Sequence, residues 1–277
     1  MKRIWCATSG DEPTLAAFLA ARLGGTLDAA LTLIAHGAVE IDRRRAETDG
    51  PLRPGARVVA FLPDGPVEAP APLTAAYRDD DVLVVDKPAG LRSQGVRGDD
   101  WDTLVARVRR ELDPVATLLH RLDREVSGLV LLPRTDRARL ALQTALDEGR
   151  LERRYTARVR GRLERPVRVT LRIGIDPRDA RRRVAHPEGE RAGEAAATRV
   201  EPLEVGDAET RVRLTLETGR THQIRVHLSA IGHPVVGDVR YGGPPSERLW
   251  LRADELVFPH PRTGAEVRVT APPDPPA

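Results

Sequence analysis

Apolar residues recur along this chain with two periods, one typical of helices and one typical of half-buried strands. Leu104, Val108 and Leu112 lie three or four residues apart, whereas Leu171 and Ile173 flank a polar residue. The expected helices cover residues 103–112, 137–146 and 221–231. The expected strands cover residues 81–85, 155–160, 167–173, 198–205, 211–216, 250–256 and 267–269. Many strands with few helices predict an α+β domain on a largely antiparallel mixed sheet flanked by helices.

The first 62 residues show a different order, a helix pair followed by two short strands. Each expected helix carries apolar residues on one face, and Asp11 and Thr26 are suited to cap the first and second helix. The expected strands cover residues 38–42 and a run that ends at Phe61. The arginine run 43–45 is expected in a loop between these strands. This order resembles the S4 RNA-binding module, which implies a small α/β module that binds RNA.

A proline-rich segment separates this module from the rest of the chain. Residues 63–72 contain four prolines, which exclude a helix or a central strand and favour a linker. We therefore expect a module at 1–62, a linker at 63–74, a larger domain at 75–271 and a disordered tail at 272–277. Within the larger domain, the charged, glycine-containing residues 178–195 predict a mobile loop.

Composition excludes several classes of protein. One cysteine among 277 residues permits neither an internal disulfide framework nor a multi-cysteine metal site. No run approaches the ~20 apolar residues of a membrane span, so we expect a cytoplasmic protein without a membrane partner. The net charge is +3, and nearly all cations are arginines, because Lys2 and Lys87 are the only lysines. Arginine forks onto phosphate oxygens, which suits a polyanionic partner.

The segment His120-Arg121-Leu122-Asp123 carries the most informative chemistry. A carboxylate lies a few residues before one of the most apolar runs in the chain, residues 129–132, which has the composition of a buried strand. An acid held against such a strand is either a paired core group or a nucleophile kept away from bulk water. The residues alone leave both interpretations open.

A second polar segment, residues 217–228, opens a predicted helix. Arg220 and Arg225 flank the helix start, where free backbone amides favour an anion, so they suit a phosphate, a buried carboxylate or a structural ion pair. His222, His227 and His233 suggest a metal site, but no cysteine or carboxylate cluster completes a ligand set, and we expect no metal. Neither a phosphate-binding loop nor a dinucleotide fingerprint occurs, and no serine hydrolase motif surrounds the serine at 127.

These segments, together with Arg153-Arg154-Tyr155 and Lys87-Pro88-Ala89-Gly90-Leu91, resemble the motifs of the RluA-type family of RNA pseudouridine synthases. The resemblance holds for the residues of each motif and for the order of the motifs along the chain. The resemblance spans residues 12–270 when the S4-like module is included. It implies an isomerase that converts uridine to pseudouridine in RNA without metal or cofactor. We expect ribosomal RNA as the substrate, with transfer RNA as the alternative, and a monomeric protein.

The resemblance also implies roles for individual residues. Asp123 acts on the ribose, either by attack at C1′ or by removal of the 2′ proton, and Tyr155 stacks on uracil. Arg225 holds Asp123 ionised, while Arg220 is the competing candidate and is preferred for a phosphate contact. Arg121 fills the gap left by the flipped uridine. The remaining expected substrate-binding residues are His120, which also supports the loop, together with His222 and Gln223.

The chain departs from the family pattern at Arg92-Ser93-Gln94-Gly95, where many relatives show a histidine-proline pair. This segment is expected to lie outside the catalytic core and to bear on the choice of RNA. The alternative function is a catalytically silent RNA-binding or ribosome-assembly factor of the same fold. It predicts salt-dependent RNA binding without isomerisation, whereas the intact set of Asp123, Tyr155 and Arg225 favours an enzyme.

Overall fold

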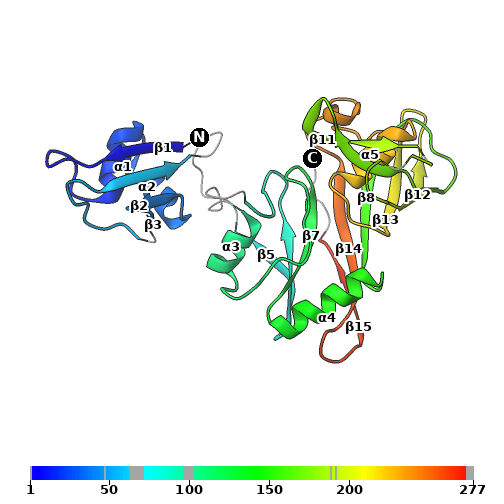
Figure 1. The fold of residues 1–277 in the computed structure, drawn as a ribbon, viewed down its shortest axis with the longest axis horizontal. Helices are drawn as coiled ribbons and strands as arrows, with labels where there is room; N and C mark the ends of the chain where they lie inside the picture. Colours follow the sequence, from blue (N-terminus) through cyan, green and yellow to red (C-terminus); the bar gives the residue numbers. More distant parts are fainter. Residues whose placement is uncertain are drawn as a thin grey trace. The chain divides into compact units, whose positions relative to one another are not determined.

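The computed structural model describes residues 2–46, 48–62, 72–95, 103–187, 189–190 and 192–272 (Figure 1). The chain is divided into two compact units. The first unit comprises Met1–Leu73 with Gln94–Pro114, and the second comprises Thr74–Ser93 with Val115–Ala277. Most of the predicted linker and nearly all of the predicted tail lie outside the described residues, so both remain predictions.

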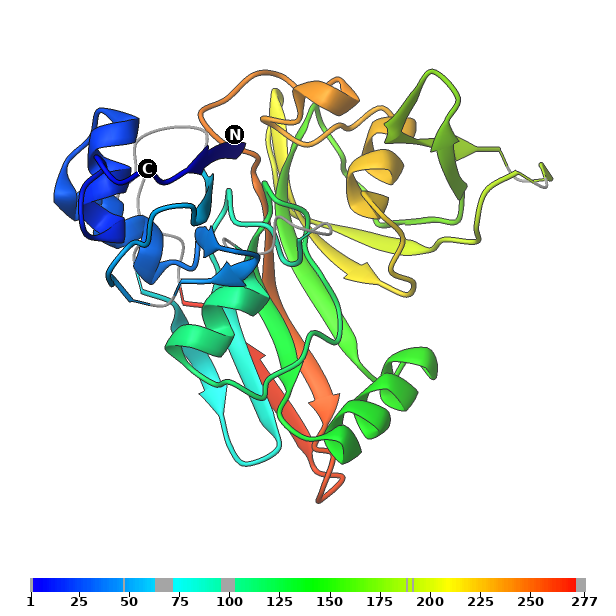
Figure 2. The ribbon, with the colours of Figure 1, turned by 60° about the vertical axis from the view of Figure 1, so that its left-hand side comes forward.

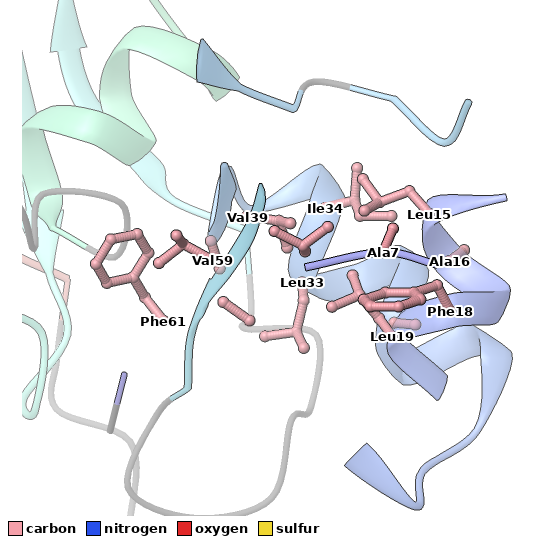
Figure 3. Packing of buried hydrophobic residues seen from close by; sticks show 14 of the residues in the cluster. Ala7, Leu15, Ala16, Phe18, Leu19, Leu33, Ile34, Val39, Val59 and Phe61 are labelled. Carbon is pink, nitrogen blue, oxygen red and sulfur yellow. The ribbon is translucent and has the colours of Figure 1, made fainter. Parts of the chain in front are cut away.

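In the first unit, two helices pack on a small antiparallel sheet. The helices are α1 (Leu15–Leu23) and α2 (Leu27–Ala35). The hydroxyls of Thr14 and Thr26 cap them, so the predicted cap Asp11 is wrong for the first helix and Thr26 is confirmed for the second. The described strands pair in the order β1 (Lys2–Cys6), β4 (Arg57–Phe61), β2 (Val39–Ile41) and β3 (Arg44–Arg45). Figure 3 shows apolar side chains of both helices meeting those of β2 and β4 in one core. The predicted helix pair and both predicted strands are therefore present.

Three features of this unit differ from the sequence prediction. Strand β1 was not predicted, and Arg44–Arg45 form the short strand β3 rather than part of a loop. Helix α3 (Leu104–Glu111) groups with this unit, where Arg110 Nη1 donates to the carbonyl of His36 at 2.9 Å. The sequence pattern had placed this helix in the larger domain. Chain order could not reveal the grouping, because it depends on contacts between residues far apart in sequence.

No single described helix is long and apolar enough to cross a membrane. Helices α1 and α2 together meet that criterion, with a 118° bend between them, and both bury their apolar faces in the core of the first unit.

In the second unit, the described strands form a nine-stranded mixed sheet in the order β5-β6-β7-β14-β8-β13-β12-β9, with β15 also paired to β14. Only the pairing of β7 with β14 is parallel among these described strands, so the predicted largely antiparallel α+β fold is confirmed. Figure 1 shows β14 between β7 and β8. The strands are β5 (Thr74–Arg78), β6 (Val82–Lys87), β7 (Ser127–Pro133), β8 (Glu152–Arg160), β9 (Val167–Val169), β12 (Thr198–Val205), β13 (Glu209–Leu216), β14 (Leu251–Pro259) and β15 (Glu266–Thr270).

Helices cover this sheet at two places. Helix α4 (Asp136–Asp147) packs against β7 and β14 (Figure 2). Helix α5 (Gln223–Ala230) packs against β12 and against β11 (Asp179–His186), a strand outside this sheet. A short 3-10 helix, Val239–Tyr241, also contacts α5. Both α4 and α5 were predicted within two residues at their ends.

A strand of a separate hairpin occupies part of the predicted mobile loop at residues 178–195. Strand β11 (Asp179–His186) pairs antiparallel with β10 (Arg172–Asp176). Half of its side chains are charged, and its apolar residues do not alternate with polar ones. The sequence pattern therefore missed the strand.

Gly128 allows the backbone of β14 to lie close to β7 at the start of the apolar strand. Its φ is +116°, and a Cβ there would lie 2.1 Å from the carbonyl oxygen of Ala253. Replacing Gly128 with alanine is expected to lower the free energy of unfolding by at least about 2 kcal/mol, measured by urea denaturation. Gly149 is the matched control, because its φ is +72° but a Cβ there would have no atom within 4 Å. Its replacement by alanine should lower the free energy of unfolding by less. Equal losses would show that close backbone approach is not what Gly128 provides.

Candidate active site

All eight residues predicted for the site line one cavity of about 400 Å³ in the second unit. Their segments are far apart in sequence: the loop before β7, strand β8, and the loop that leads into α5. The cavity walls carry a carboxylate, a phenol and several guanidinium groups, so it can bind a polar planar group and act on it. The lining residues predicted from sequence are His120, Arg121, Asp123, Tyr155, Arg220, His222, Gln223 and Arg225.

The loop that presents Asp123 is held in place by Lys87, the last residue of β6, and by Ser93, in the segment that follows it. The Ser93 hydroxyl donates to Leu122 O at 2.7 Å and accepts from Leu122 N at 3.0 Å. The ammonium of Lys87, fully buried, donates to Arg124 O at 3.3 Å, and burial lowers its pKa to about 8. The segment around Ser93, expected outside the catalytic core, thus supports it directly. A lone serine in a turn gave no sequence signal for this role.

Arg225 joins Asp123 to a second, deeper carboxylate. Its Nη1 lies 3.4 Å from Asp123 Oδ2 and 3.4 Å from Glu125 Oε2. Its Nε and Nη2 bind both oxygens of Asp238 at 2.7 and 2.9 Å. The side chains of Arg225 and Asp238 are 5% and 1% exposed, so this bidentate pair fixes the guanidinium beside Asp123. The sequence motifs assign no role to Asp238, because its pairing with Arg225 is visible only in the tertiary structure.

Tyr155 points from β8 into the same cavity and is 5% exposed. Residues along β8 alternate between buried and more exposed positions, which places Tyr155 on the covered face of the sheet. Burial raises the pKa of its phenol to about 12. The ring is therefore neutral near pH 7 and presents an aromatic face and a hydroxyl.

His222 connects Asp123 to a hydrogen-bonded tyrosine. Its φ of 58° is left-handed, and its Nδ1 lies 2.7 Å from the Tyr241 hydroxyl. That hydroxyl accepts from the backbone N–H of Arg183 at 3.1 Å, so its own proton is available to His222 Nδ1. The other ring nitrogen, Nε2, then carries a proton 3.9 Å from Asp123 Oδ2. Burial lowers the pKa of His222, which favours this neutral ring.

A family model described as RNA pseudouridylate synthase matches residues 81–230, more than half of the chain. The chain belongs to the RNA pseudouridylate synthase family. The matched segment contains every cavity residue predicted from the sequence.

Individual members of the family are similar over most of this chain. Ribosomal large subunit pseudouridine synthase D of Neisseria meningitidis serogroup A is 35% identical over 240 residues, which are 80% of this chain but 62% of that protein. The chain thus spans less than two thirds of that relative's length. An RNA pseudouridine synthase of Mycobacterium bovis is 33% identical over 280 residues, which cover 92% of this chain and 88% of that protein.

A solved structure also resembles this member of the family. Human RNA pseudouridylate synthase domain containing 1 superposes with a TM-score of 0.61 at 31% identity, covering 73% of this chain and 83% of the human chain.

His120 and Arg121 are neighbours in the segment His120–Asp123, but His120 is bonded to β7 and Arg121 is exposed. His120 Nε2 accepts the Leu131 N–H at 3.1 Å, which ties the loop to β7 as expected. Burial, with a smaller effect of the Arg153 charge, lowers the pKa of His120 to about 3, so the ring is neutral. Arg121 is exposed, and its Nη2 donates to the Thr221 hydroxyl at 3.3 Å. Arg121 is thus the more available of the two for an RNA strand.

Arg220 and Gln223 make an ion pair and hydrogen bonds, respectively, with other residues of the chain. Arg220 pairs with Glu194 at 2.5 Å and is not bonded to Asp123, so the geometry favours Arg225 as the partner of the carboxylate. The buried amide of Gln223 makes four hydrogen bonds, to Ala197 O, the hydroxyls of Thr198 and Thr218, and the N–H of residue 220. This full use of the amide argues against the predicted contact between Gln223 and substrate.

The candidate metal-binding histidines are also engaged within the protein. His227 uses Nδ1 toward the Thr198 hydroxyl and Nε2 toward Leu171 O, both at 2.9 Å. His233 Nδ1 lies 2.9 Å from Arg160 O. In the part of the chain that the structure describes, no three histidine, cysteine or acidic side chains are grouped to hold a metal ion.

Proposed function

We propose that this chain isomerises uridine to pseudouridine in ribosomal large-subunit RNA, with Asp123 as the group that acts on the ribose. One observation carries the proposal: Asp123 Oδ2 lies in a cavity beside the buried Arg225 guanidinium, 3.4 Å away, with Tyr155 in the same cavity. The choice of RNA follows the name of the Neisseria relative.

The reaction needs one carboxylate that stays ionised in a confined site. The C1′–N1 bond breaks, and its electron pair leaves with uracil while C1′ becomes positive. Asp123 meets that charge, either by bonding to C1′ or by taking the 2′ proton. The Arg225 guanidinium, 3.4 Å from Asp123 Oδ2, provides the neighbouring positive charge for this carboxylate.

Uracil must then turn so that C5 faces C1′ without leaving the site. A neutral Tyr155 ring suits this step, because stacking holds a flat base while permitting rotation in its own plane. The new C5–C1′ bond forms, the C5 proton is lost to solvent, and N1 gains a proton. The apolar side chains of Leu122, Val126 and Leu251, which line the cavity, help to keep water from trapping the reactive sugar.

The test is to map pseudouridines in a strain that lacks this chain. One or more positions in large-subunit ribosomal RNA should revert to uridine and return when the gene is restored. Purified protein should release tritium from the same RNA labelled at uridine C5. Loss confined to transfer RNA would contradict the proposed substrate. RNA binding without any isomerisation would instead favour the silent-factor alternative.

We further propose that the first unit binds RNA through Arg43, Arg44 and Arg45. All three are exposed, and none forms an ion pair with another described residue. Replacing the three with alanine should weaken RNA binding and reduce the slope of affinity against salt by about two to three, measured by filter binding. An unchanged slope would exclude phosphate contacts by these residues.

A further inference from the structure

One buried arginine in the cavity wall has no anionic partner. Among the described residues, three arginines are buried, and two of them bind carboxylates: Arg225 binds Asp238, and Arg107 binds Glu111 at 2.9 Å. The third, Arg153, is 8% exposed and makes no ion pair with any described residue. A buried cation without a counter-charge is unfavourable, so this position is poised for a ligand that carries negative charge.

The guanidinium of Arg153 has hydrogen-bond donors to spare. Its Nη2 donates to Thr218 O at 3.2 Å, while Nε is buried without an acceptor in the described part of the chain. His120 beside it shows the same deficit. Since His120 Nε2 accepts from Leu131 N, the neutral ring carries its proton on Nδ1, which also has no described acceptor. Unpaired buried donors at one place indicate that a ligand completes them.

The position of Arg153 is set by rigid neighbours. It lies two residues before Tyr155 on β8, so both side chains project from the same face of the sheet, and both line the cavity with Asp123. Gly219 packs against the other side, where a Cβ would lie 2.7 Å from Arg153 Nη1. The backbone of Thr218 and Gly219 thus holds the guanidinium in the cavity wall.

Resting on the proposed function, we propose that Arg153 binds a carbonyl oxygen of the target uracil and stabilises the base as it departs. When C1′–N1 breaks, the electron pair delocalises from N1 onto the carbonyl oxygens O2 and O4. The fixed cation then faces the oxygen that gains charge, while Asp123 meets the positive sugar. Arg153 transfers no proton in this step, and the negative charge is released when C5 bonds to C1′.

The base is the favoured ligand because of where Arg153 lies. A phosphodiester is joined to the RNA strand on both sides and therefore stays at the mouth of a cavity. A flipped base is the part of the RNA that enters one. The shared wall with the Tyr155 ring places Arg153 at the edge of a base that stacks on that ring.

The experiment compares Arg153→Met, Arg153→Lys and wild type on RNA that carries the mapped uridine. The methionine variant should lower the single-turnover rate at saturating RNA by about 100-fold, with RNA affinity and its salt slope unchanged. The lysine variant should recover part of that loss, because it keeps the charge. An increase in Kd with a salt slope reduced by about one, at an unchanged rate, would mark a phosphate contact and overturn the proposal.

A second substrate tests charge on the base itself. In RNA that carries 5-fluorouridine at the target, fluorine stabilises the departing anion, so C1′–N1 cleavage should depend less on Arg153. A methionine variant that slows both substrates by the same factor would indicate a structural role and overturn the proposal. Wild-type protein that isomerises no RNA would overturn the proposed function as well, whereas an active wild type with an unaffected methionine variant would overturn this inference alone.

Arg154→Met is the matched control. Arg154 is the next residue on β8, projects to the other face, and pairs with Glu152 and Glu255 at 2.6 and 2.7 Å. Its replacement should leave the single-turnover rate unchanged. If circular dichroism shows that the Arg153 variants do not fold, Gly219→Ala is the alternative, because its Cβ would displace the Arg153 guanidinium without removing it. This variant should lower the single-turnover rate, and by a smaller factor on the 5-fluorouridine substrate than on the uridine substrate.

Discussion

Replacing Asp123 with asparagine is expected to lower the rate of pseudouridine formation by about 10⁴-fold or more. Asparagine has nearly the same shape but can neither bond to C1′ as a nucleophile nor accept the 2′ proton. The fold should be unaffected, because the Asp123 side chain is 24% exposed and its contact with Arg225 is at 3.4 Å. The measurement is tritium release from C5-labelled RNA under single-turnover conditions.

Glu125 provides the matched control for this prediction. Its Oε2 lies at the same 3.4 Å from Arg225 Nη1, but its side chain is 50% exposed. Glu125→Gln should keep activity within about fivefold, since an exposed ion pair contributes at most about 1 kcal/mol. If Asp123→Asn retained wild-type activity, or if Glu125→Gln were the inactive variant, Asp123 would not be the catalytic carboxylate.

Replacing Asp238 with alanine is expected to lower the free energy of unfolding by about 3–5 kcal/mol and to abolish most activity. The change leaves the Arg225 guanidinium, 5% exposed, without its bidentate partner. The freed cation would also be drawn from its present position beside Asp123. Stability is measured by urea denaturation followed by circular dichroism, and activity by tritium release.

A double variant separates stability from activity. Arg225→Met with Asp238→Leu removes both buried charges, and apolar replacements of a buried ion pair are often neutral. Stability should therefore return to within about 2 kcal/mol of wild type, while activity stays low because Asp123 has lost its cation. Recovery of activity in the double variant would show that catalysis by Asp123 does not need the Arg225 guanidinium beside it.

The local pattern of apolar and polar residues was enough to predict a helix or strand where that element buries one face. The apolar run at 129–132 became β7, and the helical spacing around Gln223 became α5. Strand β11 was not predicted, because half of its side chains are charged and its pairing with β10 is made by the backbone. That strand nevertheless supplies the Arg183 N–H that orients Tyr241 toward His222.

The sequence by itself determined the family, the sheet-based fold and eight of the residues that line the cavity. These follow from motifs and periodicity, which are local properties of the chain. Only the tertiary structure decided which arginine lies beside Asp123, because Arg220 and Arg225 differ in partners that are distant in sequence, Glu194 and Asp238. The same physical reason applies to Ser93 and Arg153. Their roles depend on which hydrogen bonds are made and which are left unmade in three dimensions.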